Sequence, residues 1–420
     1  MAKRGNEPEE PGQRNKNSCV HKMRIAIPSF FYKPAGGGIA RYVDTLAKIF
    51  SEMGHYVDII TASYNGKKTE REGNITIYRL PCMNIFDNPE DNKEKSRDFL
   101  RFLKRYSKKN PDVFLAQSFH TIVSSIGHVL ALNMVSMQTN IPIILNVHSF
   151  IQEDKSSDLK FQLIHNLYWD KVVCIGSHLA ESIFKRGIST EMLKSTYPPV
   201  DLRLFRPDLG SKWLRSRVDV SNEDFLILHA SRIDNYDVAE SKGVFVLLKA
   251  LSMIKEKNVK LIISAAPCIP QFEESKRETI KKIIDTGKLL GIENRVFVET
   301  FDPSNMPFVY NGCDLCVLVS DYENCPLALS EAMACGLPVI GSTIGGIPEI
   351  IDSNKSGILI SPNDSVRLSE EIMKVIKNRK KMREFGEVGR HQVEEKQAAN
   401  KICRSLLGLC ESVICKKKVN

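Results

Sequence analysis

The stretch DYENCPLALSEAMACGLPVIGSTIGGIPEII, residues 321–351, combines a loop, a helix start and a strand-like run. Pro326 suits the first position of a helix, because the N–H group that proline lacks would have no partner there. Asn324 or Cys325 would then occupy the cap region. The later run LPVIGST is apolar and continuous, as expected for a buried strand. We therefore predict a loop–helix–strand unit, the repeating element of an α/β protein.

Two carboxylates frame the start of this predicted helix. Glu323 lies in the loop before it, and Glu331 lies more than one turn inside it. The backbone N–H groups between them point out of the helix N-terminus, where they can hold anionic or hydroxyl oxygens. This arrangement fits a ligand with hydroxyls at both ends and negative charge between them, which describes a nucleotide-diphosphate sugar. An ordinary pair of solvated glutamates is the alternative.

Strand-like apolar runs alternate with longer helical patterns along the whole chain. Many are continuous runs, typical of parallel strands that helices cover on both faces. Each half of the chain also opens with a strand, a loop and a helix. The sequence therefore predicts an α/β fold with two Rossmann-like, doubly wound parallel-sheet domains that face each other across a cleft. The predicted strands are MRIAIPSF, HYVDIIT, PDVFLAQ, IPIILNV, KVVCIGS, FLILHAS, KLIISAA, RVFVET, DLCVLVS and LPVIGST.

Length supports two domains, because 420 residues exceed what one hydrophobic core usually serves. The stretch STYPPVDLRLFRPDLGSKWLRSRVDVSNED carries three prolines and no long periodic run, so we expect the hinge near residues 200–222. The predicted divisions are a disordered N-terminal segment (1–22), an N-terminal domain (23–205), a C-terminal domain (206–395), and a C-terminal helix with a basic tail (396–420).

Composition is that of a folded, cytoplasmic protein. The chain is 42% hydrophobic and 26% charged, and no apolar run reaches the roughly 18 residues of a membrane span. Most of the eleven cysteines lie inside apolar runs and are expected to be reduced and buried. Cys313 and Cys316 form a C-x-x-C pattern, but no second Cys or His pair accompanies them at zinc-site spacing.

A net charge of +9 favours anionic partners, and one segment concentrates it. In RDFLRFLKRYSKKN, residues 97–110, Phe99, Leu103 and Tyr106 share one helical face. Such a basic amphipathic helix could contact an anionic membrane peripherally. The more ordinary interpretation, which we favour, is a surface helix that packs its apolar face on the sheet. The cations, mostly off that face, are Arg97, Arg101, Lys104, Arg105, Lys108 and Lys109.

From Met23 to about Glu395 the chain resembles the retaining glycosyltransferases of family four, which have the two-domain architecture called GT-B. The strongest match is the E-x7-E element and its continuation, EAMACGLPVIGSTIGGIPEII. The resemblance implies that Glu331 binds the ribose hydroxyls of a nucleotide sugar and that Glu323 contacts the transferred sugar. At the helix N-terminus between them, Asn324, Cys325 and Leu327 are also expected to belong to the nucleotide-sugar site.

Further stretches match the family in the right order. SRIDNYDVAESKG resembles its arginine and lysine pair, so Arg232 and Lys242 would neutralise the diphosphate leaving group. KPAGGGIARYV resembles the glycine-rich loop after the first strand, where Gly37 and Gly38 permit close backbone approach. LNVHSF resembles the strand-end histidine, which places His148 at the donor sugar.

Two loops depart from the family pattern. The interdomain stretch has Pro198 and Pro199 where Asn-Gly is usual, and ISAAPCIP lacks the usual glycines. The first glycine loop also does not read G-x-G-x-x-G, although Asp58 lies about 20 residues further on, so a nicotinamide enzyme has little support. The chain contains no Asp-x-Asp pair and its nine histidines form no metal-ligand spacing, which predicts no metal and no cofactor.

Taken together, the residues and the resemblance imply a metal-independent retaining glycosyltransferase. It would move a sugar from a nucleotide-diphosphate sugar, held by the C-terminal domain, to a hydroxyl of a glycan or lipid-linked acceptor, held mostly by the N-terminal domain. Its catalytic residues would be Glu323, His148, Arg232 and Lys242, and no nucleic acid is implied as a partner. A sugar-nucleotide epimerase of the same architecture and a non-catalytic sugar-nucleotide binder are the alternatives.

Overall fold

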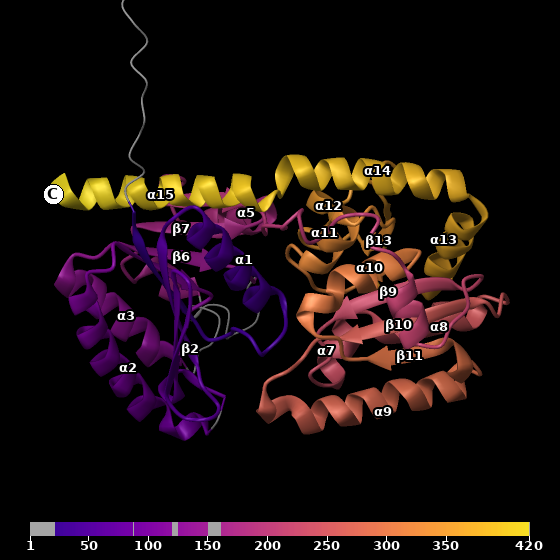
Figure 1. The fold of residues 1–420 in the computed structure, drawn as a ribbon, viewed down its shortest axis with the longest axis horizontal. Coiled ribbons are helices and arrows are strands. Elements are labelled where there is room, and N and C mark those ends of the chain that lie inside the picture. Colours follow the sequence, from indigo (N-terminus) through magenta and orange to yellow (C-terminus); the bar gives the residue numbers. More distant parts are fainter. Residues whose placement is uncertain (1–21, 87, 120–124, 150–160, 420) are drawn as a thin grey trace, which may run out of the picture.

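The structure is a computed structural model that describes residues 22–419, except 87, 120–124 and 150–160. Its helices and strands form two α/β domains, each built on one sheet (Figure 1). The predicted fold class is therefore confirmed. The predicted disordered segment, residues 1–22, lies outside the described residues apart from Lys22.

The first sheet has eight strands, which are parallel except for an antiparallel pair at one edge. Its order along the sequence reverses between β1 and β5. The strands, in spatial order, are β3 (Lys68–Glu72), β4 (Ile75–Leu80), β2 (Tyr56–Ala62), β1 (Arg24–Ser29), β5 (Val113–Gln117), β6 (Ile143–Val147), β7 (Lys171–Ile175) and β8 (Leu193–Thr196). Its helices are α1 (Gly38–Glu52), α2 (Asn92–Tyr106), α3 (Ile126–Thr139) and α5 (Ser177–Lys185).

The second sheet has six parallel strands and reverses between β9 and β12. The strands, in spatial order, are β11 (Val296–Glu299), β10 (Val259–Ala265), β9 (Phe225–Ser231), β12 (Leu315–Leu318), β13 (Val339–Ser342) and β14 (Ile358–Ile360). Its helices are α6 (Lys212–Arg217), α7 (Tyr236–Ser241), α8 (Val244–Met253), α9 (Glu273–Leu289), α10 (Met306–Gly312), α11 (Leu327–Ala334), α12 (Ile347–Ile350), α13 (Ser365–Lys377) and α14 (Arg379–Lys396).

All ten predicted strands overlap an observed strand, but four strands were missed. The edge strand β3 reads KTERE and has no apolar pattern, while β8 and β14 are only four and three residues long. The fourth, β4, alternates apolar and polar residues in ITIYRL. Short or polar strands of this kind are stabilised by their neighbours in the sheet and carry little signal of their own.

The chain crosses between the domains twice, at adjacent positions. The first domain's sheet ends at Thr196, whereas Val200 is already buried in the core of the second domain. The return lies between Val393, in the second core, and Ala399, in the first. The two crossings pair with each other, because Val200 donates to the Gln397 carbonyl (2.8 Å) and accepts from the Ala399 N–H (2.9 Å). The crossing therefore lies immediately before the predicted hinge range, residues 200–222.

The C-terminal helix α15 (Ala399–Val419) returns to the first domain and runs along α1 (Figure 1). The predicted helix is present, but the sequence did not indicate which domain it would cover. It contributes one face to the core that β1, β2 and α1 share. The buried residues of that face are Ala399, Ile402, Cys403, Leu406, Leu407, Cys410, Val413 and Ile414.

Helix α2 packs its apolar face inward, against α3 and the first sheet. Phe99, Leu103 and Tyr106 are all buried, so this face is closed to lipid and the surface-helix interpretation is correct. Tyr106 donates to Asp58 Oδ2 (2.7 Å), which also accepts from Arg24 Nη1 (3.0 Å). Asp58 therefore has a buried structural role. Among the described residues, no helix is long and apolar enough to cross a membrane, and the ten described cysteines are all free.

Replacing Leu406 by alanine is expected to destabilise the chain by about 2–5 kcal/mol, because it leaves a cavity between α15 and the first core. Leu406 is only 2% exposed. Ser405→Ala, one residue away on the exposed side of the helix, is the matched control and should change stability by less than about 0.5 kcal/mol. Urea unfolding of both variants measures the difference. Equal stability of the two would contradict the assigned packing of α15.

Candidate functional site

A cavity of about 620 Å³ lies between the two domains. It opens beside the two places where the sheets reverse their order, and loops that follow β1, β9, β10 and β12 line it. Ligands of doubly wound proteins bind at such reversal points, because the loops on either side diverge there. Every site residue that the sequence predicted lines this one cavity: Gly37, Gly38, His148, Arg232, Lys242, Glu323, Asn324, Cys325, Leu327 and Glu331.

The glycine loop at the start of α1 touches the other domain directly. The Gly36 N–H donates to the Pro267 carbonyl (2.7 Å), and a Cβ on Gly36 would lie 2.8 Å from that proline. Gly37 has φ of 104°, and a Cβ there would lie 2.9 Å from Arg232 Cδ. The segment ISAAPCIP, which contains Pro267, lacks glycines. The close approach of the two backbones is possible because Gly36, on the first domain, has no side chain. Gly38 has open space around it.

Two cations line the second domain's wall of the cavity, each beside a carboxylate. Lys242, at the end of α7, forms an ion pair with Glu323 in the loop after β12, and both side chains are less than one-fifth exposed. Arg232 follows β9, is 44% exposed, and lies 3.2 Å from Asp234 Oδ2 through Nη1. Burial raises the pKa of Asp234. The wall thus combines fixed positive charge with the carboxylate of Glu323.

The loop that carries Glu323 rests on two glycines from the later part of the 321–351 stretch. A Cβ on Gly345 would overlap the Glu323 carbonyl oxygen, and a Cβ on Gly346 would overlap that of Asn324. Gly345 also has φ of 56°, a left-handed conformation. The sequence IGG is therefore required for the position of the loop, a link that the spacing of the two glutamates did not reveal.

Helix α11 begins at Leu327, and Pro326 is its cap residue. The prediction that Pro326 occupies the first helical position was wrong by one residue. Glu331 lies inside the helix and its side chain is 7% exposed. Its Oε1 lies 3.3 Å from Arg41 Nε, and its Oε2 accepts from Tyr310 Oη (3.1 Å). Burial raises the pKa of Glu331, while Arg41 and Tyr310 act in the opposite direction.

The predicted cap residues face the first domain. The Asn324 amide donates to the carbonyls of His148 (3.1 Å) and Ile175, at the ends of β6 and β7. The sulfur of Cys325 packs against Gly176, where a Cβ would lie 2.7 Å away. Both residues line the cavity, yet their side chains hold the Glu323 loop against the first domain. The cap residue is Pro326, so neither residue caps the helix as predicted, and the sequence did not indicate their contact with the first domain.

His148 is half-buried and neutral. Burial lowers its pKa to about 3, and its ring lies edge-on to Tyr42 at 4.5 Å between centroids. Its Nε2 lies 2.8 Å from Gln117 Oε1. Gln117 donates through its amide to the Leu115 carbonyl, so its Oε1 is the acceptor and we assign the proton to His148 Nε2. His148 can therefore orient a ligand hydroxyl without carrying charge.

Sequence reasoning missed three residues at this junction: Arg41, Tyr310 and Glu349. Arg41 lies in the quoted glycine-loop segment, but nothing there showed which residue it would meet. Glu349 crosses between the domains to accept from the N–H groups of Ser177 (2.8 Å) and His178 at the start of α5. A carboxylate is favourable at a helix N-terminus. Within the described ranges, no group of three or more His, Cys, Asp or Glu could hold a metal ion.

Two family models match the chain. The model described as glycosyl transferases group 1 matches residues 215–392, and the model described as glycosyltransferase family 4 matches residues 36–204. Among known proteins, the N-acetyl-alpha-D-glucosaminyl L-malate synthase of Bacillus anthracis is 24% identical over 387 residues, which are 91% of this chain and 94% of that protein.

Solved structures share the fold. The sucrose-phosphate synthase of Thermosynechococcus elongatus superposes with a TM-score of 0.80 at 21% identity, over 94% of this chain and all of that one. The Anabaena protein HepE, solved in complex with UDP and glucose, gives a TM-score of 0.73 at 18% identity, over 93% of this chain and all of that one.

Replacing Gly345 by alanine should cost more stability than the same change at Gly291. Both glycines have positive φ, 56° and 69°, so each alanine carries a left-handed strain of about 1–2 kcal/mol. Only Gly345 meets another backbone, whereas Gly291 has open space, so Gly345→Ala must also displace the Glu323 loop. The difference between the two variants in free energy of unfolding, measured with denaturant, gives the cost of displacing the Glu323 loop. Equal losses would mean that the loop accommodates a Cβ.

Proposed function

Since the chain belongs to the group 1 glycosyltransferases of GT-B architecture, we propose that it is a retaining enzyme that transfers a sugar from a nucleotide-diphosphate sugar to an acceptor hydroxyl without a metal ion. One observation carries this proposal. Two carboxylates and two cations, Glu323, Glu331, Arg232 and Lys242, come from the segments that follow β12 and β9 and line a single cavity between the domains.

The second domain would bind the donor. Glu331 would accept from the ribose hydroxyls, and Arg232 and Lys242 would neutralise the diphosphate near the N-terminus of α11. Lys242 already lies against Glu323, so this cation would serve both the diphosphate and the carboxylate that contacts the sugar. HepE was solved with UDP and glucose, which makes UDP-glucose the first donor to test.

The acceptor hydroxyl would attack the sugar from the face that the diphosphate leaves. The bond between the anomeric carbon and the phosphate oxygen breaks as the new glycosidic bond forms. A phosphate oxygen of the donor takes the acceptor proton, so no protein base is needed. Arg232 and Lys242 would stabilise the charge that develops on the leaving diphosphate, while Glu323 and neutral His148 hold the sugar in place.

The acceptor is proposed to be a glycan or a lipid-linked sugar, bound mostly by the first domain. The relatives named after malate and sucrose phosphate make small anionic acceptors the contrasting class. Labelled UDP-glucose, followed by GDP and ADP sugars, is incubated with each acceptor class and without acceptor, in EDTA and in magnesium. Acceptor-dependent transfer with an unchanged anomer in EDTA supports the proposal. Isomerisation of the donor sugar would indicate an epimerase. Donor binding without any reaction would indicate a non-catalytic binder. Activity that is lost in EDTA and restored by magnesium would indicate a metal-dependent enzyme.

The two glutamates should separate by experiment. Glu331→Gln should weaken binding of the free nucleoside diphosphate by roughly 1.5 to 3 kcal/mol, because a charge-assisted hydrogen bond to the ribose is lost in every bound state. Glu323→Gln should leave that binding nearly unchanged and lower kcat, because its contact with the sugar matters most in the transition state. Calorimetric titration and steady-state rates measure both effects. The reverse pattern would exchange the two roles.

We also propose that the α2–α3 face contacts anionic membrane peripherally. Arg97, Arg101, Lys104 and Arg105 of α2 are exposed, and the neighbouring helix α3 exposes Leu130 (44%), Met134 (45%) and Met137 (66%). Exposed apolar side chains beside clustered cations suit an anionic interface. This surface replaces the buried apolar face of α2 as the lipid contact.

Vesicle co-sedimentation tests the α2–α3 face. Wild-type binding should favour anionic over neutral vesicles and weaken with salt. The double change Lys104→Glu with Arg105→Glu should abolish it, whereas Arg277→Glu with Lys281→Glu, an identical charge change on the exposed side of α9, should reduce it much less. If both double variants lost vesicle binding equally, net charge alone would explain the binding and the proposed surface would be wrong.

A further inference from the structure

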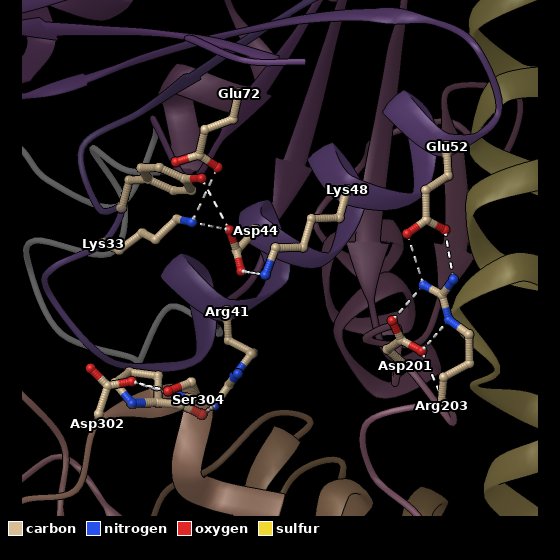
Figure 2. A network of polar contacts seen from close by, with 12 residues as sticks. Lys33, Arg41, Asp44, Lys48, Glu52, Glu72, Asp201, Arg203, Asp302 and Ser304 are labelled. Carbon is tan, nitrogen blue, oxygen red and sulfur yellow. Dashed lines mark hydrogen bonds and ion pairs between the residues drawn. The ribbon is translucent and has the colours of Figure 1, made fainter. Parts of the chain in front are cut away.

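Arg41 reaches from the first domain into the second. It lies in the first turns of α1, and its guanidinium makes three contacts beyond its own domain. Nε lies 3.3 Å from Glu331 Oε1, Nη2 donates to the Pro303 carbonyl (2.7 Å), and the group lies 5.4 Å from the centre of the Phe205 ring. Figure 2 shows Arg41 pointing from α1 toward the segment that holds Asp302 and Ser304.

In the described part of the chain, the charged side chain that lies against Glu331 is Arg41. Tyr310 on α10, Cys316 on β12 and Cys335 after α11 also face it. Burial raises the pKa of the tyrosine hydroxyl and of both thiols, so all three stay neutral. Within the described part of the chain, Arg41 is the cation that forms an ion pair with this buried carboxylate. A buried carboxylate that loses such a partner favours its neutral form.

We propose that Arg41 is a positioning residue that makes ribose binding by Glu331 depend on closure of the two domains. The inference rests on the proposed function, because it takes Glu331 as the ribose ligand. When the domains are closed, Arg41 holds one oxygen of the carboxylate and Tyr310 holds the other. When they open, Arg41 leaves with the first domain, and the carboxylate loses its charge partner and keeps only the hydrogen bond from Tyr310.

The place of α1 at the hinge makes Arg41 sensitive to small movements. At the far end of the helix, Glu52 forms an ion pair with Arg203 (2.8 Å), which also binds Asp201 just after the crossing (Figure 2). At a rise of 1.5 Å per residue, Arg41 lies roughly 16 Å along the helix from this anchor. A rotation of about 10° at the anchor would then move Arg41 by about 3 Å, enough to break its contact with Glu331.

Three variants test the role of Arg41. Arg41→Met removes the charge and keeps the stem, Arg41→Lys restores the charge, and Lys48→Met removes a cation from the same helix that pairs with Asp44 and not with Glu331. Calorimetry with UDP, or with the nucleoside diphosphate that the wild-type chain binds, should give an affinity about tenfold lower for Arg41→Met. Arg41→Lys should recover part of it, and Lys48→Met should match the wild type.

The pH dependence distinguishes this role from a loss of packing. Without Arg41 the pKa of Glu331 rises, so the carboxylate takes up its proton at a higher pH. As the pH is lowered, the affinity of Arg41→Met should therefore begin to fall at a higher pH than the affinity of the wild type. Titration of the ligand's own phosphate is common to all variants and cancels. A parallel pH profile would overturn the proposal.

Two further measurements complete the test. In a double-mutant cycle, Arg41→Met should add little to Glu331→Gln, because it acts through that carboxylate, and additive losses would contradict it. Because the contact between Arg41 and Glu331 stabilises the closed arrangement, its loss should favour the open one. Small-angle scattering without nucleotide should therefore give a larger radius of gyration for Arg41→Met than for the wild type or Lys48→Met. Equal radii would overturn the coupling. Failure of the proposed function would instead appear as a wild-type chain that binds no nucleotide.

Discussion

The cleft depends on one constraint of parallel sheets. Where the order of strands reverses, the loops on either side turn away from each other and leave a crevice at the carboxyl ends of the strands. This chain has two such points, between β1 and β5 and between β9 and β12. The glycine loop follows β1, the turn with Lys242 follows the β9 loop, and the Glu323 loop follows β12. Because the two crevices face each other, residues from distant parts of the chain form one cavity.

Contacts between the two domains often involve backbone groups, which explains where glycine is required. Gly36 donates to Pro267, the Asn324 amide reaches two carbonyls of the first domain, and Glu349 accepts from the N-terminus of α5. Such contacts bring chain segments closer than side chains would allow. They fix the position of the loops, so the domains can move relative to one another only if these bonds are exchanged for others.

Charge at the site is balanced in pairs. Lys242 lies against Glu323, Arg232 against Asp234, and Arg41 against Glu331. Desolvated charges need such partners, and an anionic ligand would compete for the cations with carboxylates already in place. The first two pairs lie within one domain and the third links the domains. This difference makes the last pair sensitive to closure.

The sequence by itself determined the α/β class, the two sheets and the glutamate pair at a helix start, because these are local patterns, and a family resemblance supplied the other predicted residues of the cavity. It missed β3, β8 and β14, which are short or polar and exist because a neighbouring strand pairs with them. Only the tertiary structure decided that α15 covers the first domain, that Asn324 faces away from the helix it precedes, and that Arg41 meets Glu331. Each of these depends on how two distant segments pack. No spacing within one segment encodes the identity of its partner.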